Sequence, residues 1–351
     1  MDIPRMKIRL TEVAAQAEVS EATVSRVLNG KPGVSEATRA AVLTAIDVLG
    51  YEVPVKLRPR SGALVGLIVP ELTNPIFPAF AQTIETGLAM RGFTPVLCTQ
   101  TPGGLHEDVY VQMLLDRGVA GIICVSGQHA DTQEGVERYT ALVDQGIPLV
   151  LVNGYREGVR AAFVSSDDDA AIELSLRHLI ELGHRRIGLA VGQTQYVPVR
   201  DKIAAFRRLA AEELPELDVD EFIQSGLFTV EGGGLVARRL VEKGATGIIF
   251  ASDIMALGAV RQAQRMGLSV PRDLSIVGYD DSLLMGFTDP PLTTIRQSVA
   301  EMSDVVVQAL LAQINGDMTA PPELVFRPEL VVRASTARVP ERGTSANLAL
   351  A

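Results

Sequence analysis

The sequence has few of the residues from which disulfide bridges and metal sites are built. Its 351 residues include two cysteines and four histidines. Cys98 and Cys124 lie in apolar segments, so we expect two buried thiols rather than a disulfide. The spacing of the histidines is not that of metal ligands. The four are His106, His129, His178 and His184. The sequence therefore predicts neither a metal site nor a bound cofactor.

Long apolar runs are also missing. The longest strongly apolar segments, such as 63–70 and 247–251, have the length of strands and fall short of the ~20 residues that a membrane span needs. The first residues, MDIPRMKIRLTEVAAQ, carry charges along their whole length and lack the apolar core of a secretory signal. We therefore expect a cytoplasmic protein that does not contact a membrane.

The sequence motifs of common catalytic sites are missing as well. There is no Gly-x-Ser-x-Gly motif and no phosphate-binding loop ending in Lys-Ser or Lys-Thr. Three glycines at 232–234 precede a helical segment and could cradle a phosphate, but no such Lys-Ser or Lys-Thr follows them. We therefore expect that the protein is not an enzyme.

Apolar residues and acidic charge, by contrast, are plentiful. Apolar residues make up 47% of the chain, and the net charge is −10. Residues 1–60 contain nine Lys or Arg and seven Asp or Glu, so the rest of the chain carries a net −12. A mildly basic segment before an acidic body is typical of a DNA-reading domain. The length fits one small domain and one large two-lobed domain.

The first fifty residues predict three short helices. Apolar residues recur at helical spacing before Ser20, and Ser20 and Ser35 can each cap a following helix. Between the first two helices, residues 18–20 leave room only for a tight turn, and residues 29–33 form a loop by composition.

The second of these helices has two distinct faces. At 100° per residue, Val24, Val27 and Leu28 share one face, which packs on the other helices. The opposite face combines small residues with polar groups, as a helix in the major groove requires, and Arg26 can pair with a guanine edge. On periodicity alone, a helical module that binds protein fits equally well. The expected DNA contacts of this segment are Ser20, Glu21, Ala22, Thr23, Ser25, Arg26 and Asn29.

The string VSEATVSRVLNGKPGVSEATR resembles the helix-turn-helix of the lactose-repressor family, and the likeness extends through residues 49–51. The resemblance implies an all-α DNA-binding domain at residues 1–52 that reads a pseudo-palindromic operator. Two positions depart from the family pattern. Glu18 replaces the usual glycine of the turn, so a residue with a Cβ has to adopt a positive φ. Arg9 replaces a capping threonine and can contact a phosphate instead.

In this family a short hinge helix follows the DNA-binding domain and wedges a leucine into the minor groove. Here the hinge is residues 53–62, where Pro54 fits the pattern but Pro59 would break a helix that begins there. Two interpretations stay open, a wedge formed by a leucine and a stiff basic linker that follows phosphates. The DNA contacts expected from the hinge are Lys56, Leu57 and Arg58.

From Ala63 onward, strand-like runs alternate with helical segments, which is typical of parallel α/β sheets with helices on both faces. The pattern runs twice, which predicts two lobes and a ligand cleft at the carboxyl ends of their strands. The last part of the chain returns to both lobes, which implies crossovers and a hinge that closes over a ligand. The expected strands are 64–69, 95–98, 120–125, 149–152, 186–191, 246–251 and 275–279.

Further strings, among them GLIVPELTNPIF, DLSIVGYDD and RPELVVRAST, resemble the effector domain of the same repressors, which is similar to periplasmic sugar-binding proteins. The resemblance implies a two-lobed effector-binding and dimerisation domain over 63–336. The predicted N-lobe is about 63–157 and 293–323, and the predicted C-lobe is about 158–290 and 324–336. Residues 337–351 fall outside the resemblance, and we expect a disordered tail there.

Polar residues follow several of the expected strands, where members of this family bind a sugar or a base. The resemblance also implies a basic ligand contact at Lys202, where arginine is usual, and a stacking aromatic at Phe228. Such a set suits a polyol. The expected effector contacts are Asn74, Phe77, Asn153, Lys202, Phe228, Asp253 and Asp280. A structural role stays open for three of them, because Asp253 and Asp280 can cap helices and Phe228 can belong to the core.

Together these features predict a homodimeric transcription regulator, and more specifically a repressor, whose operator affinity is controlled by a sugar or sugar derivative bound between two lobes. Two alternatives stay open. The first is a sugar-binding protein without a DNA role, and the second is a corepressor-dependent regulator with a non-sugar ligand.

Overall fold

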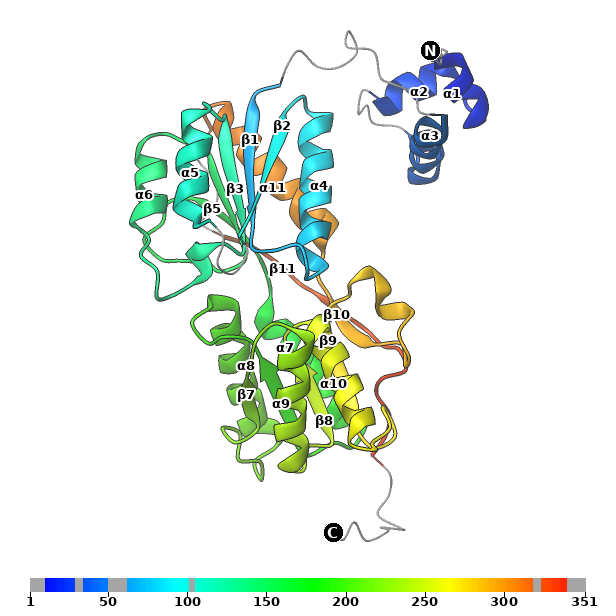
Figure 1. The fold of residues 1–351 in the computed structure, drawn as a ribbon, viewed down its shortest axis with the longest axis vertical. Coiled ribbons are helices and arrows are strands. Elements are labelled where there is room, and N and C mark those ends of the chain that lie inside the picture. The colour runs from blue at the N-terminus through cyan, green and yellow to red at the C-terminus, as the bar shows by residue number, and fades with distance from the viewer. Residues whose placement is uncertain (1–9, 29–33, 50–61, 101–104, 318–322, 340–351) are drawn as a thin grey trace, which may run out of the picture.

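The computed structural model of the chain describes residues 10–28, 34–49, 62–100, 105–317 and 323–339. Within these residues, three helices form an N-terminal head, and two α/β lobes form the body (Figure 1). The helices of the head are α1 (Leu10–Gln16), α2 (Glu21–Leu28) and α3 (Glu36–Leu49).

The head is held together by a small apolar core. Val13 of α1, Val24 and Val27 of α2, and Val42 and Ala45 of α3 are buried against one another. This core contains the apolar face predicted for the second helix, as far as its side chains are described. The polar face of α2 therefore points away from the head.

Local geometry at the helix ends of the head agrees with the sequence analysis. The backbone N–H of Thr23 donates to the Ser20 hydroxyl at 3.1 Å. The backbone N–H of Thr38 donates to the Ser35 hydroxyl at the same distance, so both serines cap the helix that follows them. In the turn between α1 and α2, Glu18 adopts φ +52°. This is the left-handed conformation predicted from the absence of the usual glycine, and it costs ~1 kcal/mol for a residue with a Cβ.

The N-lobe is built on a six-stranded parallel sheet in the order β11-β5-β4-β3-β1-β2. Helices α4 (Ile76–Met90) and α11 (Val299–Ile314) cover one face, and α5 (Glu107–Asp116) and α6 (Glu137–Asp144) cover the other. The strands are β1 (Leu64–Val69), β2 (Thr94–Thr99), β3 (Gly121–Val125), β4 (Leu149–Val152), β5 (Ala162–Ser166) and β11 (Glu323–Phe326).

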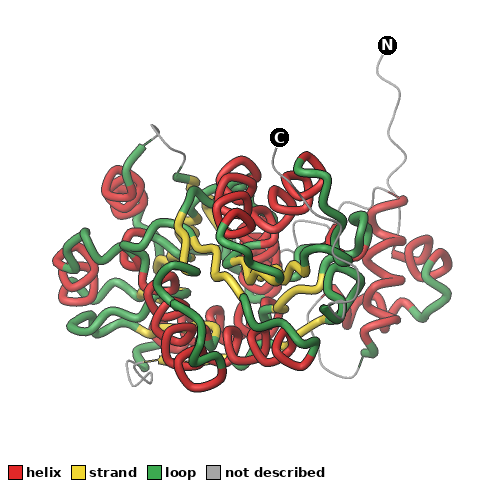
Figure 2. The backbone as a smooth tube through the Cα atoms, turned by 90° about the horizontal axis from the view of Figure 1, so that it is seen from below, coloured by secondary structure: helices red, strands yellow, loops and turns green. Residues whose placement is uncertain are grey.

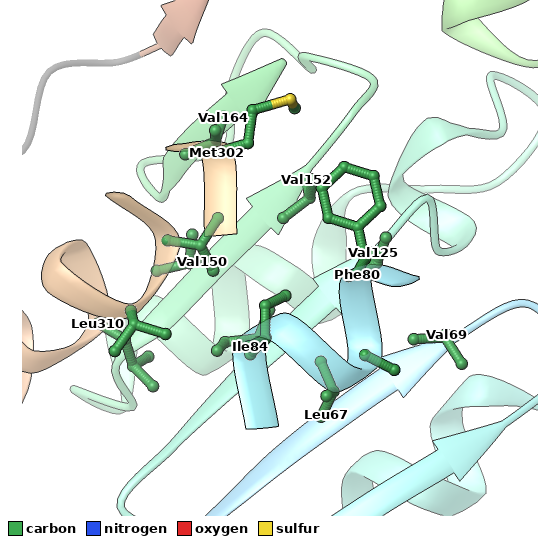
Figure 3. Packing of buried hydrophobic residues seen from close by; sticks show 14 of the residues in the cluster. Leu67, Val69, Phe80, Ile84, Val125, Val150, Val152, Val164, Met302 and Leu310 are labelled. Carbon is green, nitrogen blue, oxygen red and sulfur yellow. The ribbon is translucent and has the colours of Figure 1, made fainter. Parts of the chain in front are cut away.

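Side chains from opposite ends of the chain share the core of this lobe. In Figure 3, Phe80 and Ile84 of α4 and Leu310 of α11 lie against Leu67 and Val150 of the sheet. All five are essentially inaccessible to solvent. Since central strands such as β3 are buried on both faces, their sequences are continuous apolar runs, as expected for a parallel sheet covered on both sides.

The C-lobe repeats the architecture with the sheet order β12-β10-β9-β8-β6-β7, in which only β12 runs antiparallel to its neighbour. Helices α7 (Asp168–Glu181) and α8 (Val197–Glu213) pack on one face, and α9 (Val230–Glu242) and α10 (Asp253–Arg265) pack on the other. Figure 2 shows the strands of the body, in yellow, lying between helices, in red. The strands are β6 (Ile187–Val191), β7 (Ile223–Ser225), β8 (Gly247–Phe250), β9 (Ser275–Asp280), β10 (Thr293–Arg296) and β12 (Glu329–Val331).

The chain crosses between the lobes three times, and the structure corrects the predicted lobe boundaries at each crossing. The segment 158–166 belongs to the N-lobe, because β5 pairs with β4. Strand β10 belongs to the C-lobe, because it pairs with β9, and β11 belongs to the N-lobe, because it pairs with β5. These three strands were not among the seven expected from the sequence, and their hydrogen-bonded neighbours are distant in the sequence, so the predicted boundaries assigned the segments to the wrong lobe.

The described residues bear on membrane-spanning helices, on clusters of metal ligands and on the two cysteines. None of the described helices combines the length and the apolar character of a membrane span. Within the described ranges, no three His, Cys, Asp or Glu side chains gather as metal ligands would. Cys98 and Cys124 are buried free thiols, as predicted, on the two strands that flank β1.

His184 fastens the end of the described chain to the base of the C-lobe. Its Nε2 donates to the carbonyl oxygen of Ala337 at 3.1 Å, and its Nδ1 lies 2.9 Å from the Thr246 hydroxyl. The backbone N–H of Val339 donates to the Leu182 carbonyl at 3.0 Å. Residues 337–339 are therefore part of the lobe, which corrects the predicted start of the tail, and the rest of that tail lies outside the described residues.

We predict that His184→Ala lowers the free energy of unfolding by about 2 kcal/mol near neutral pH, because buried hydrogen-bonding groups lose their partner. Burial lowers the pKa of His184 in the folded protein, so its stabilisation is full above the ordinary value of 6.5 and declines as the pH falls below it. Urea unfolding at about pH 8 and about pH 5.5 measures both effects. His106→Ala, at an exposed position, is the control, and an equal loss in both variants would contradict the prediction.

Candidate functional site

The two lobes enclose a cavity of about 720 Å³ at the carboxyl ends of their strands. In the N-lobe the cavity is reached by residues just beyond β1, β2, β3 and β4, and in the C-lobe by residues at or just beyond β8, β9 and β10. Parallel strands place these ends on one edge of each sheet, which is where ligands bind in such folds. The volume falls in the range of small-molecule sites in proteins.

Six of the seven effector contacts expected from the sequence line this cavity. They come from both lobes and include polar, charged and aromatic side chains, namely Asn74, Phe77, Asn153, Lys202, Phe228 and Asp280. Their contact with an effector stays a prediction.

Asp253 is the expected contact that does not line the cavity, and its carboxylate is used inside the protein. Its Oδ1 accepts from the Thr294 hydroxyl at 2.5 Å, and its Oδ2 accepts from the backbone N–H of Ser282 at 2.8 Å. Burial raises the pKa of Asp253 to about 7. The side chain of Asp253 therefore connects the loop after β9 to β10. The prediction was wrong because a position just after a strand does not fix the direction in which its side chain points.

Asp280, at the end of β9, presents a buried carboxyl group to the cavity. Its Oδ1 accepts from Nε2 of Gln297 at 2.7 Å, and its Oδ2 lies 3.4 Å from the Ser252 hydroxyl that donates to it. Burial, and after it the neighbouring carboxylate of Asp253, raise the pKa of Asp280 well above its ordinary range. The environment therefore favours the uncharged form of this group.

Lys202, the cation expected to meet the ligand, already has a partner. Its Nζ lies 2.5 Å from Oδ1 of Asp168, with both side chains nearly buried. The hydroxyl of Tyr279 donates to the same carboxylate oxygen at 2.8 Å, and the Lys202 ammonium lies 4.0 Å from the centre of the Tyr279 ring. The positive charge that Lys202 brings to the cavity wall is therefore neutralised within the protein.

Hydrogen bonds join the two lobes at two places around the cavity. The amide of Asn74 in the N-lobe donates to the Ser252 hydroxyl of the C-lobe at 3.4 Å. On another side, the backbone N–H and the hydroxyl of Thr132 both donate to the carbonyl oxygen of Gln195, each at 2.8 Å. The lobes are thus in contact across the cleft as well as through the three crossovers.

Several cavity-lining residues were not identified from the sequence. Each of them stands at the end of a strand or within three residues after it, so applying the strand-end argument to every strand would have included them. They are Gln100, Gln128, Asp168, Gln193, Tyr279 and Gln297.

In the head, the predicted DNA contacts that the structure describes belong to α2 or cap it. Glu21, Ala22 and Arg26 are exposed, and Thr23 and Ser25 are half-buried. Ser20 caps the helix through its hydroxyl. The remaining predicted contacts, Arg9, Asn29, Lys56, Leu57 and Arg58, lie outside the described residues.

Comparison with known proteins agrees with both parts of the molecule. Residues 9–53 match the family "Bacterial regulatory proteins, lacI family", and residues 176–336 match a "Periplasmic binding protein-like domain". The HTH-type transcriptional regulator MalR of Streptomyces coelicolor is 56% identical over 342 residues, covering 96% of this chain and 99% of the relative.

Two solved structures extend the comparison. The transcriptional regulator CelR in complex with cellobiose is 31% identical, with a TM-score of 0.69, over 93% of this chain and 99% of the other. The lac repressor dimer bound to operator and the anti-inducer ONPF is 26% identical, with a TM-score of 0.69, over 95% of this chain and 100% of the other.

A helix-turn-helix head and a two-lobed domain with a cavity between its lobes define a DNA-binding transcriptional regulator. The chain belongs to the lacI family of bacterial regulatory proteins.

We predict that Asp168→Asn lowers the free energy of unfolding by about 3 kcal/mol, because it leaves the buried Lys202 ammonium without its partner. Asp169→Asn is the matched control, since the neighbouring Asp169 pairs with Arg208 at the surface, where solvent screens the pair, and its loss of stability should be far smaller. The double variant Asp168→Asn/Lys202→Met should regain stability relative to Asp168→Asn. Urea unfolding checks all three, and equal losses at 168 and 169 would refute the assignment.

Proposed function

We propose that this regulator is a repressor, that a neutral sugar bound in the cavity between its lobes is its effector, and that the effector releases operator DNA. The observation that supports the proposal best is the lining of the cavity. It combines aromatic rings with amide and carboxyl groups, which suits a molecule with apolar ring faces and many hydroxyl groups. The relative CelR was solved with cellobiose, and the lac repressor is named as a repressor.

The charges around the cavity favour an uncharged ligand. Among the cavity-lining residues that the structure describes, Lys202 is the single lysine or arginine, and Asp168 neutralises it. Besides the paired Asp168 and the buried Asp280, the lining also contains the carboxyl groups of Glu71, Asp131 and Glu134. A phosphate or carboxylate on the ligand would therefore meet like charges without a free cation. This argues for a sugar rather than a sugar phosphate.

The same contacts suggest how the cavity communicates with the head. A ligand that touches both lobes changes the free energy of their closed arrangement, and the crossovers convert closure into a rotation of one lobe. In a twofold dimer, that rotation changes the spacing of the two heads and hence the fit to a pseudo-palindromic operator. Effector and operator binding are thereby coupled.

A surface of the C-lobe supports the dimer that this mechanism needs. Leu283 and Leu284 of η2 (Leu283–Gly286) and the neighbouring Phe287 are 86%, 62% and 83% exposed. Large apolar side chains grouped at this exposure are typical of a surface that a protein partner covers. The partner we propose is a second copy of this chain, in line with the dimeric lac repressor.

We predict that Arg26→Ala reduces the preference for operator over random DNA by about 10–100-fold, because a bidentate contact to a guanine is lost. The operator is first selected from a random DNA pool with the wild-type protein, and affinities are then measured by fluorescence anisotropy. Arg208→Ala, an exposed arginine on the C-lobe, should leave the preference unchanged. Wild-type selectivity in Arg26→Ala would refute the assignment of Arg26 as a base contact.

For the effector, we predict that neutral sugars release the operator and that Asp280→Ala needs at least about tenfold more sugar, because a hydrogen-bonding group is lost from the cavity wall. The assay titrates glucose, ribose, maltose, trehalose and cellobiose into the protein–operator complex. Asp220→Asn, at an exposed carboxylate of the C-lobe, is the control. If no neutral sugar releases the operator, the proposed effector class is wrong. If Asp280→Ala responds normally, the cavity assignment is wrong.

A further inference from the structure

A fully buried carboxylate stands behind the N-lobe wall of the cavity. Glu107, in the first turn of α5, has no exposed surface. Its Oε2 accepts from Nε2 of Gln100 and from the backbone N–H of Gln128, both at 2.9 Å, and its Oε1 accepts from the Tyr139 hydroxyl. The guanidinium of Arg138 lies 3.6 Å from Oε1. Glu107 thus organises a network that includes two cavity-lining glutamines.

The chemistry of this network fixes which end of each glutamine faces the cavity. Nε2 of Gln100 donates to Oε2 of Glu107, so the NH₂ group of Gln100 is turned toward Glu107. A guanidinium only donates, so Gln128 has to turn its carbonyl oxygen toward Arg138, with which it is hydrogen-bonded. The carbonyl oxygen of Gln100 and the NH₂ group of Gln128 are the ends of the two amides that these hydrogen bonds do not use.

These remaining groups are available to a ligand. Both glutamines line the cavity. Within the described part of the chain, the hydrogen bonds of the two side chains are those to Glu107 and Arg138, and none involves Oε1 of Gln100 or Nε2 of Gln128. The N-lobe wall therefore presents one oriented acceptor and one oriented donor.

We propose that Gln100 and Gln128 bind the effector, and that Glu107 and Arg138 are positioning residues that hold the two amides in opposite orientations. Gln100 accepts a hydrogen bond from a ligand hydroxyl, and Gln128 donates one to a ligand oxygen. A pair of neighbouring hydroxyl groups on a sugar ring supplies both partners. This inference rests on the proposed function and adds to it an acceptor–donor pair that selects among sugars.

The cost of burying Glu107 gives a physical reason for the fixed orientation of the two glutamine amides. A buried carboxylate is tolerated when its oxygens are fully hydrogen-bonded, and four groups surround this one. An amide held in this way does not have to be ordered when the ligand arrives, so less conformational entropy is lost on binding. The orientation is built into the fold before the ligand enters.

The first test measures ligand binding to the full-length protein by isothermal titration calorimetry. The probes are glucose, ribose, maltose, trehalose and cellobiose, and the sugar that binds the wild type most tightly is used for the variants. Gln100→Ala and Gln128→Ala should each weaken its affinity about tenfold, as expected for one lost hydrogen bond to a desolvated partner. Gln128→Glu, which keeps the acceptor for Arg138 but loses the donor, should weaken it similarly.

The matched control is Gln112→Ala, because Gln112 is an exposed glutamine of α5 that bonds Asp116. It should change the affinity less than about twofold. Wild-type affinity in Gln100→Ala and Gln128→Ala overturns this inference while the sugar effector stands. Absence of binding by every probe removes the neutral-sugar effector itself, and this inference with it.

The second test separates positioning from simple structural support. Glu107→Gln should weaken sugar binding about tenfold, because its amide can no longer accept from all its neighbours and Gln100 becomes free to turn. In the double variant Glu107→Gln/Gln100→Ala, the two losses should be clearly less than multiplicative, since both act through one amide. Multiplicative losses would show that Glu107 acts independently of Gln100, and would overturn its positioning role.

Discussion

The direction of the strands is the constraint on which the rest of the body depends. Every strand pair except β10 and β12 is parallel, so each sheet brings its strand ends to a single edge. Three crossovers place those two edges opposite each other, and loops that would otherwise be scattered meet around one cavity. Groups as distant in sequence as Asn74 and Ser252 come within 3.4 Å only because of this arrangement.

The two regions of the cavity wall use polar groups in different ways. In the C-lobe, Lys202 is paired with Asp168, and burial raises the pKa of Asp280, which favours its uncharged form. In the N-lobe, Glu107 is kept away from the cavity, and its effect reaches the wall through neighbouring amides. Both arrangements favour neutral hydrogen-bonding groups with defined directions. The proposed recognition of an uncharged polyol requires such groups.

Much of this could be predicted from the sequence, and the failures have physical causes. Apolar runs located most strands of the body, and the missing glycine at Glu18 correctly predicted a positive φ. The lobe to which β5, β10 and β11 belong could not be predicted, because hydrogen-bond partners far apart in the chain decide it. Asp253 was placed in the cavity for a similar reason, since position along a strand does not reveal that its carboxylate satisfies Ser282 and Thr294.

The internal pairing of Lys202 with Asp168 also has a consequence for the response of the regulator to ionic strength. Filling the cavity with an uncharged molecule displaces no net charge, and a nearly buried ion pair is screened little by salt. Contacts of the head with DNA phosphates, in contrast, release counterions, so they weaken steeply as salt concentration rises. A change in ionic strength therefore acts directly on the DNA contacts, and it reaches the cavity only through the proposed coupling between operator and effector.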